Sequence, residues 1–271
     1  MNIDSHVHFW KYDPQIYSWI PEEMSVIRKD FLPADLEPLL KKNGIDGCIA
    51  VQADQNEEET VKLLESANTY DFIKGVVGWL DLSAENVINR LELYSRDPYF
   101  KGVRHTVWDE KGEFMLAPEF QNGVAALQDF GLIYEILAFD YQLSAAVELV
   151  KKYPKQKFVL DHLGKPKVSE GVSEAWKRNI QKLGVLPNVA CKISGLFTQP
   201  NNLNWKAADF SPFLEVVQQA FGEDRLMFGS DWPVSTAAVS YEQTVEQIKN
   251  HFSESSLEKI LGENARAFYN L

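Results

Sequence analysis

Residues 3–10 read Ile3-Asp4-Ser5-His6-Val7-His8-Phe9-Trp10, and this stretch predicts both the first strand of the fold and the beginning of a site. Its apolar and β-branched residues are typical of a buried strand. Side chains at positions i and i+2 of a strand point to the same face, so His6 and His8 project together. Two neighbouring imidazoles can bind a metal ion, or they can donate hydrogen bonds to an oxygen that gains negative charge. The competing interpretation is a chance pair of histidines on a solvent-exposed strand.

Short apolar segments alternate with amphipathic segments along the whole chain. The expected strands are Ile3–His8, Gly47–Ala53, Ile73–Leu80, Lys101–Val107, Leu132–Leu137, Lys157–His162, Val189–Ser194 and Arg225–Asp231. The expected helices are Pro33–Lys42, Glu57–Thr69, Ala84–Tyr94, Pro118–Phe130, Leu143–Lys152, Val172–Leu183, Phe210–Phe221 and Tyr241–Asn250. Most of these strands are apolar throughout, which is typical of a parallel sheet covered by helices. Eight β-then-α units in 271 residues predict an α/β protein with one domain over residues 1–271, a (β/α)8 TIM barrel.

An open doubly wound sheet is the alternative α/β fold. Such a sheet commonly carries a glycine-rich turn directly after its first strand. The turn after His8 begins with Phe9 and Trp10 and has no glycine-rich sequence, which favours the barrel.

The charge and cysteine content narrow the class of protein. The chain has 27 basic and 39 acidic residues, a net charge of −12, which argues against nucleic acid or an anionic membrane surface as a partner. We expect neither a transmembrane helix, which needs about 18 apolar residues, nor a signal peptide. Cys48 and Cys191 lie in apolar runs, so we expect buried free thiols and a cytoplasmic protein. The sequence gives no indication of the oligomeric state.

Polar and aromatic residues gather where the predicted strands end, which is where the catalytic residues of a (β/α)8 barrel lie. In chain order these residues are His6 and His8, Gln52 and Asp54, Trp79 and Asp81, Arg104 and His105 followed by Trp108, Glu135, Asp161 and His162, Lys192 and Ser194, and Ser230 to Pro233. Four of the five histidines belong to this set, and only His251 lies on a predicted surface helix. This convergence predicts an enzyme, with a non-catalytic binding protein on the same scaffold as the alternative.

These strand ends resemble the amidohydrolase superfamily. Its pattern of His-x-His on the first strand, His on the sixth and Asp on the eighth corresponds here to His6-Val7-His8, His162 and Asp231. The chain is most similar to the amidohydrolase-2 branch, the 2-pyrone-4,6-dicarboxylate lactonase-like group. The segments that carry this closer resemblance are Asp4–Trp10, Gly78–Leu82, Gly102–His105, Asp161–Pro166, Lys192–Gly195, Gly229–Pro233 and Glu263–Tyr269. The resemblance spans the full chain and implies a barrel enzyme that hydrolyses a lactone.

The same resemblance bears on metal content. Binuclear members of the superfamily carry a carboxylated lysine or a glutamate on strand four and usually a histidine on strand five, and this chain has neither. We therefore expect no two-metal centre. One zinc ion is possible on a set of three nitrogens and one oxygen, and the residues that could supply it are His6, His8, His162 and Asp231. Lactonases of this branch work without an obligatory metal, so we expect no required cofactor and an optional Zn²⁺.

Lactone hydrolysis needs an activated water and a stabilised carbonyl oxygen. Asp231 is the expected general base, although an aspartate before a turn can also be a helix cap. His6, His8 and His162 are the expected donors to the carbonyl oxygen.

The predicted substrate-binding residues are Arg104, His105, Trp108, Trp10, Trp232 and Gln52. Adjacent strand residues face opposite ways, so only one of Arg104 and His105 should line the pocket. Trp10, Trp79, Trp108 and Trp232 could form an apolar wall that stacks on a sugar ring, and for Trp79 packing between helices is an equal alternative. A dicarboxylate substrate would need several arginines, and Arg104 alone lies at a strand end, so we expect a neutral sugar lactone such as L-fuconolactone or L-rhamnonolactone.

Two lysines have alternative roles. Lys192 could contact the substrate, but pairing with Glu135 or Asp161 inside the barrel is favoured, since internal charges are usually compensated. For Lys165, in the loop after the sixth strand, solvent exposure and a role in the site are both open. The rival reaction is zinc-dependent decarboxylation, which the missing histidine on strand five disfavours.

Overall fold

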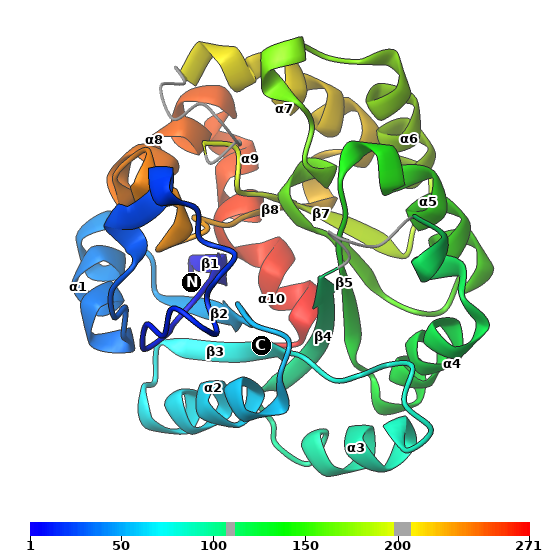
Figure 1. The fold of residues 1–271 in the computed structure, drawn as a ribbon. Helices are drawn as coiled ribbons and strands as arrows, with labels where there is room; N and C mark the ends of the chain where they lie inside the picture. Colours follow the sequence, from blue (N-terminus) through cyan, green and yellow to red (C-terminus); the bar gives the residue numbers. More distant parts are fainter. Residues whose placement is uncertain (107–111, 198–206) are drawn as a thin grey trace.

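Eight short apolar segments form parallel strands, and each strand is hydrogen-bonded to the next one along the chain (Figure 1). The structure is a computed structural model that describes residues 1–106, 112–197 and 207–271. The strands are β1 (Ile3–Val7), β2 (Gly47–Val51), β3 (Ile73–Gly78), β4 (Phe100–Thr106), β5 (Ile133–Leu137), β6 (Phe158–Leu160), β7 (Val189–Ile193) and β8 (Leu226–Phe228). Their order in the sheet follows their order in the sequence, as in a (β/α)8 barrel.

The barrel closes where the end of β1 meets the loop after β8. Val7 and Trp232 form a parallel bridge, and the His8 amide donates a hydrogen bond of 2.7 Å to the Trp232 carbonyl. The Asp231 amide donates to the His6 carbonyl at 2.9 Å. The predicted barrel is thus confirmed, and its closure places Asp231 beside the two histidines of β1.

Helices surround the barrel and cover the outer face of its strands (Figure 1). The α-helices are α1 (Pro33–Asn43), α2 (Glu57–Thr69), α3 (Val87–Tyr94), α4 (Pro118–Leu127), α5 (Leu143–Lys152), α6 (Glu174–Gly184), α7 (Ala207–Phe221), α8 (Tyr241–His251), α9 (Glu254–Glu258) and α10 (Asn264–Tyr269). The first eight match the predicted helices, α2 and α5 with the predicted ends and the other six with shifted ends. Among the described residues, no helix is long and apolar enough to cross a membrane.

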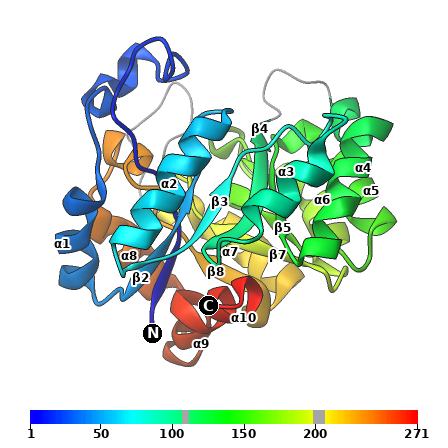
Figure 2. The same cartoon turned by 90° about the horizontal axis from the view of Figure 1, so that it is seen from below.

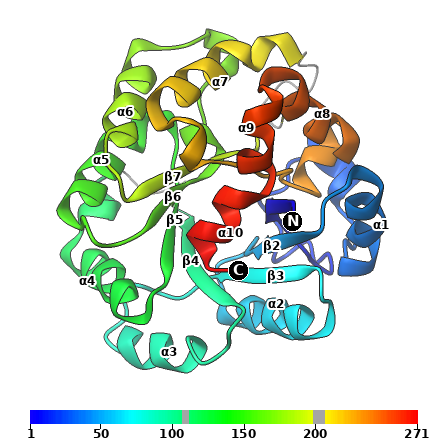
Figure 3. The same cartoon turned by 180° about the vertical axis from the view of Figure 1, so that it is seen from behind.

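The last two helices, α9 and α10, were not predicted. Both chain termini lie at the same end of the barrel as these helices (Figure 2). Helix α10 crosses the centre of that end (Figure 3), where Ala265 and Tyr269 pack against the inward-facing residues of the strands. These strand residues are Ile3, Ile49, Val51, Val77, Ile133, Val159, Ala190 and Met227. Helix α10 therefore closes the amino-terminal end of the barrel, and the carboxyl ends of the strands form the opposite face.

Most strands end one to three residues earlier than the sequence predicted, and in β6 and β8 this moves two site residues out of the strand. Strand β6 ends at Leu160 and β8 ends at Phe228, so His162 and Asp231 lie in the loops that follow. Both residues have left-handed backbones, with φ of 53° and 58°. The left-handed backbone conformation is energetically unfavourable for residues with a Cβ. Residues that adopt it are concentrated at functional sites.

Candidate active site

His8 lies just beyond β1 and has a fixed tautomer when neutral. Its Nδ1 atom is 2.8 Å from the Val51 carbonyl oxygen, which can only accept, so Nδ1 carries the proton. The other ring nitrogen, Nε2, is 3.3 Å from Asp231 Oδ1. Burial lowers the pKa of His8, and the hydrogen bond with Asp231 opposes that shift. His8 therefore presents Nε2 to the Asp231 carboxylate.

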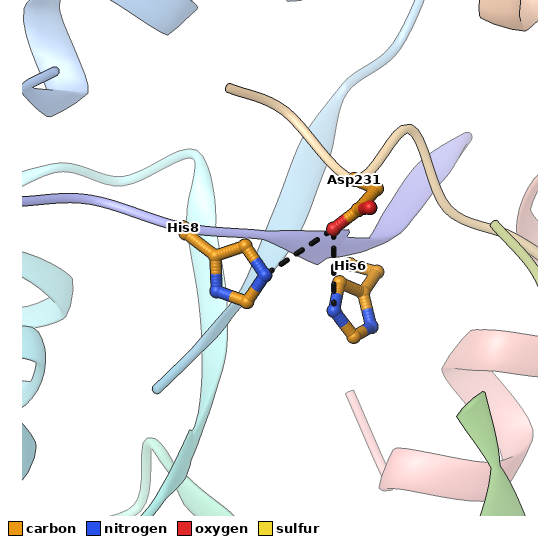
Figure 4. A group of neighbouring side chains, drawn as sticks. All are labelled: His6, His8 and Asp231. Carbon is orange, nitrogen blue, oxygen red and sulfur yellow. Dashed lines mark ion pairs between the residues drawn. The ribbon is translucent and has the colours of Figure 1, made fainter. Parts of the chain in front are cut away.

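Asp231 directs its carboxylate toward both His6 and His8 (Figure 4). Its Oδ1 atom is 3.3 Å from His8 Nε2 and 3.8 Å from His6 Nε2. Burial raises the pKa of Asp231, but the opposing influence of the neighbouring His162 and His8 outweighs burial and holds the pKa below its ordinary value. The carboxylate is therefore ionised at neutral pH and can accept a proton.

His162 lies in the short helical turn Asp161–Gly164, directly after β6. Its Nδ1 atom is 2.8 Å from the Ser194 hydroxyl, and burial holds the pKa of the imidazole well below 6.5. Gly195 makes room for this ring, since a Cβ on that residue would lie 2.5 Å from His162 Nδ1. The ring is thus neutral and is fixed in place by the two residues that follow β7.

His6 is enclosed by charged side chains within the barrel. Its Nε2 atom is 3.1 Å from Arg104 Nη1, and its Nδ1 atom is 3.2 Å from Lys192 Nζ and 3.5 Å from Asp161 Oδ1. Burial, followed by the positive charge of Lys192, lowers the pKa of His6 well below 6.5. The ring is fully buried and therefore supports the site from below.

A buried network of charges links β4, β5, β6 and β7. Lys192 Nζ lies 2.6 Å from Glu135 Oε2 and 3.4 Å from Asp161 Oδ1, and Arg104 Nη1 lies 3.1 Å from Asp161 Oδ2. The Tyr269 hydroxyl of α10 also contacts Glu135. The predicted pairing of Lys192 with Glu135 or Asp161 is confirmed, and two cations are balanced by two carboxylates.

A cavity of about 260 Å³ opens above this network, at the carboxyl ends of the strands. Its described lining consists of His8, Trp19, Ala53, Asp54, Gln55, Arg104, Thr106, Leu137, His162, Lys165, Asp231 and Val234. Four of the predicted site residues are among them: His8, Arg104, His162 and Asp231. Of Arg104 and His105, Arg104 is the one that lines the cavity, together with Thr106 of the same strand.

Four other predicted substrate contacts are absent from that described lining: Trp10, Trp232, His105 and Gln52. Trp10 donates its indole N–H to the Lys29 carbonyl at 2.9 Å, and Trp232 packs against the ring of Phe31. Both tryptophans are buried among aromatic rings, so the predicted role of Trp10 and Trp232 in stacking on the substrate is not supported by the described lining.

The other two residues, His105 and Gln52, make contacts elsewhere. His105 accepts the indole N–H of Trp79 at 3.3 Å and packs against Phe114, so its alternative as a core histidine fits the structure. Gln52 donates its side-chain amide to the Arg104 carbonyl at 3.3 Å. Trp108 lies outside the described residues.

Lys165, Asp54, Gln55 and Thr106 line the cavity but were not among the predicted site residues. The signals for Lys165 and Asp54 were present in the sequence, because both follow strand ends. No pattern separated them from the solvent-exposed polar residues of other loops.

Three donor atoms suit a single zinc ion. One nitrogen each of His6 and His8 and one oxygen of Asp231 lie within 4.8 Å of one another. Histidine and aspartate are common zinc ligands, so the donor types fit. Arg104 Nη1 competes at this position, because it lies 3.1 Å from His6 Nε2.

A model of the amidohydrolase family matches residues 3–271. The chain belongs to the amidohydrolase family. An L-fucono-1,5-lactonase from Burkholderia multivorans is 37% identical to this amidohydrolase over 268 residues, which cover 95% of this chain and 90% of the relative. Another from Burkholderia ambifaria is 33% identical over 270 residues, with coverages of 98% and 91%. These matches confirm the prediction of a lactone hydrolase.

The solved structures include an amidohydrolase from Burkholderia multivorans with bound zinc. It has a TM-score of 0.95 and 35% identity to this amidohydrolase, and the match covers 100% of this chain and 99% of the other. A zinc ion therefore binds to at least one similar protein.

Proposed function

We propose that this amidohydrolase hydrolyses a neutral sugar lactone, with L-fucono-1,5-lactone as the first substrate to test. The observation that carries the proposal is the Asp231 carboxylate on the wall of a 260 Å³ cavity, beside His8 and His162. The cavity is smaller than the roughly 300–1,000 Å³ typical of sites for drug-sized ligands, which suits a single sugar ring. The names of the two Burkholderia relatives support the choice of lactone.

The charges around the cavity favour a neutral substrate over a dicarboxylate. Asp54 and Asp231 contribute two carboxylates to the described lining, against the two cations Arg104 and Lys165. Arg104 is already paired with Asp161 at 3.1 Å. A dianion would need more cations that are free to pair with it. The polar residues Asp54, Gln55 and Thr106 can instead form hydrogen bonds with ring hydroxyls.

The proposed reaction begins at Asp231. Its carboxylate takes a proton from water while the water oxygen bonds to the lactone carbonyl carbon, and the C=O π electrons move to the carbonyl oxygen. Collapse of this intermediate reforms the C=O bond and breaks the bond to the ring oxygen, which receives the proton from Asp231. The product is an open-chain hydroxy acid, and Asp231 is ionised again.

The predicted donor roles differ among the three histidines. His162 can donate from Nε2 when the Ser194 hydroxyl donates to Nδ1, and it lines the cavity. His8 can donate from Nε2 only while both ring nitrogens carry protons, because Nδ1 donates to Val51. His6 has both nitrogens turned to charged neighbours below the cavity, so we assign it a positioning role.

We also propose that the reaction does not require a metal. If zinc binds, His6, His8 and Asp231 would hold it, and it would polarise the carbonyl as a Lewis acid. Without it, Asp231 accepts the proton and the cavity's own donors face the carbonyl oxygen.

The test is a panel of aldonolactones assayed by acid release, with an equal panel of lactones that carry carboxylates. We expect at least one neutral sugar lactone to reach a kcat/KM of about 10⁴ M⁻¹s⁻¹ or more, the lower end of the usual enzyme range. No turnover of any sugar lactone would refute the proposal. Measuring CO₂ release from aromatic acids with added zinc tests the rival decarboxylase.

A further inference from the structure

We propose that Lys165 is a further catalytic residue of this site, whose ammonium group donates a hydrogen bond to the lactone carbonyl oxygen and stabilises the negative charge that forms there. This inference rests on the proposed lactone hydrolysis. It concerns a residue that lies outside the pattern of His6, His8, His162 and Asp231 and whose role the sequence leaves open.

The turn that presents His162 also presents Lys165. The Lys165 amide donates to the His162 carbonyl at 2.8 Å, and both residues have left-handed backbones, with φ of 43° for Lys165. The Trp176 indole N–H donates to the Leu163 carbonyl at 2.9 Å, which fixes the middle of the turn to α6. The two side chains therefore enter the cavity from one rigid segment, as precise catalysis requires.

The pairing of the buried charges also places Lys165 at the cavity, apart from the buried network of Lys192, Arg104, Glu135 and Asp161. In that network Lys192 pairs with Glu135 and Asp161, and Arg104 pairs with Asp161. Lys165 lines the cavity together with Asp231. Burial lowers the pKa of Lys165, and the negative charge of Asp231 is the largest influence that favours its charged form.

The reaction moves negative charge from one partner of Lys165 to another. In the resting enzyme the carboxylate of Asp231 carries the charge. When Asp231 takes the proton from water, it becomes neutral and the charge develops on the carbonyl oxygen of the substrate. Lys165 remains protonated throughout and interacts with the oxyanion more strongly than with the neutral ground-state carbonyl. An interaction that strengthens in the transition state raises kcat.

The experiment replaces the ammonium and then restores it chemically. In the Lys165→Cys variant, 2-bromoethylamine converts the new thiol into a side chain of nearly lysine length with a terminal ammonium. The native Cys48 and Cys191 are fully buried, so the folded protein offers the reagent only the introduced thiol. Iodoacetamide gives a neutral adduct at the same position. The control is Lys167→Cys, at an exposed lysine two residues along that pairs with Glu170.

We expect Lys165→Cys to lower kcat by about 10²-fold or more, the usual effect of losing one oxyanion donor. Aminoethylation should raise the kcat of the Lys165→Cys variant at least tenfold. The iodoacetamide adduct should keep the low kcat of the unmodified variant. The Lys167→Cys protein should keep wild-type activity under all three treatments. A purely structural lysine would not distinguish the charged adduct from the neutral one.

Two results would overturn the assignment, and they differ from failure of the proposed function. If Lys165→Cys keeps kcat within about threefold of wild type, or if both adducts restore activity equally, Lys165 does not stabilise the oxyanion. If the wild-type protein hydrolyses no lactone of the panel, the proposed function fails and the role of Lys165 fails with it.

Discussion

The guanidinium of Arg104 lies 3.1 Å from the Nε2 atom of His6. A guanidinium only donates hydrogen bonds, so Arg104 meets the lone pair of His6 Nε2, while His6 Nδ1 faces the Lys192 ammonium at 3.2 Å and Asp161 Oδ1 at 3.5 Å. The same lone pair is the one that a zinc ion would use. Arg104 therefore places a fixed positive charge where a metal would bind, and it weakens the site for a cation.

From this relationship we predict that lactone hydrolysis survives removal of metal. Protein dialysed against a strong chelator should keep kcat within about threefold of the untreated sample, with metal content checked by elemental analysis. A loss of more than tenfold that added Zn²⁺ reverses would contradict this prediction and would make zinc a required cofactor. Apo protein reconstituted with Mg²⁺ is the control for nonspecific ionic effects.

Removal of the Asp231 carboxylate tests the general base. Asp231→Asn keeps the shape of the side chain but cannot accept the proton, so kcat should fall by about 10²–10⁴-fold, the usual contribution of general base catalysis. The assay is acid release in chelated buffer. Asp54→Asn is the control, since it removes the other carboxylate of the described lining and should alter KM more than kcat. Activity within a few-fold of wild type in the Asp231 variant would exclude the proposed base.

The pH profile follows from the environment of Asp231. Burial raises the pKa of its carboxyl group, but the opposing influence of His162 and His8 outweighs burial and holds the pKa below its ordinary value. The base is then ionised across the neutral range, so we expect kcat/KM to stay constant as the pH falls from 8 to about 5. Initial rates in overlapping buffers, corrected for spontaneous hydrolysis, measure this. A single ionisation near neutrality in the acid limb would show that another group is the base.

Much of the fold follows from local sequence pattern, and the exceptions have a physical cause. Strands such as Gly47–Val51 are apolar at every position, so their burial is visible in the sequence. The five- and six-residue helices α9 and α10 are too short to be stable alone. Helix α10 exists because Tyr269 packs against the barrel interior, a contact that depends on the completed fold.

The sequence predicted which strand ends form the site, but it did not predict which side chains at those ends face the cavity. Strand β4 carries buried residues on both faces, so no polar alternation shows whether Arg104 or His105 points inward. Trp10 and Trp232 border the site in sequence but pack among other aromatic rings. The left-handed backbones of His162 and Asp231 arise from the loops and barrel closure, which no local pattern encodes.

Gly195 supports His162 and gives a matched pair of variants. Its φ is +63°, and an added Cβ would lie 2.5 Å from His162 Nδ1. Gly195→Ala should cost about 1–2 kcal/mol of stability from the left-handed backbone, and should lower kcat at least tenfold by displacing the ring. Gly131→Ala, at φ +67° with open space around its Cβ, should show only the loss of stability. Equal activity of the two variants would show that the position of His162 is unimportant.

Glu59 should make the stability of the protein depend on pH. Its carboxylate accepts the Ala53 and Asp54 amides at 3.0 and 2.8 Å, which fixes the loop that lines the cavity. Burial raises the pKa of Glu59 from 4.5 to about 8, against the opposing effect of these hydrogen bonds. The folded state therefore binds this proton more tightly than the unfolded state. The contribution of protonated Glu59 to the free energy of unfolding is complete below pH 4.5. It is lost as the pH rises through about 8.

The Glu59→Gln variant cannot ionise at this position, so its free energy of unfolding should fall less than that of wild type between pH 5 and pH 9. Because one pKa unit corresponds to about 1.4 kcal/mol, we expect the two proteins to diverge by at least that amount across the range. Urea unfolding at pH 5, 7 and 9 measures it. Glu58→Gln removes an exposed carboxylate from the same helix. The pH dependence of its free energy of unfolding should match that of wild type. If the Glu59→Gln curve is also parallel, Glu59 has no raised pKa, and its burial is compensated by the two amides alone.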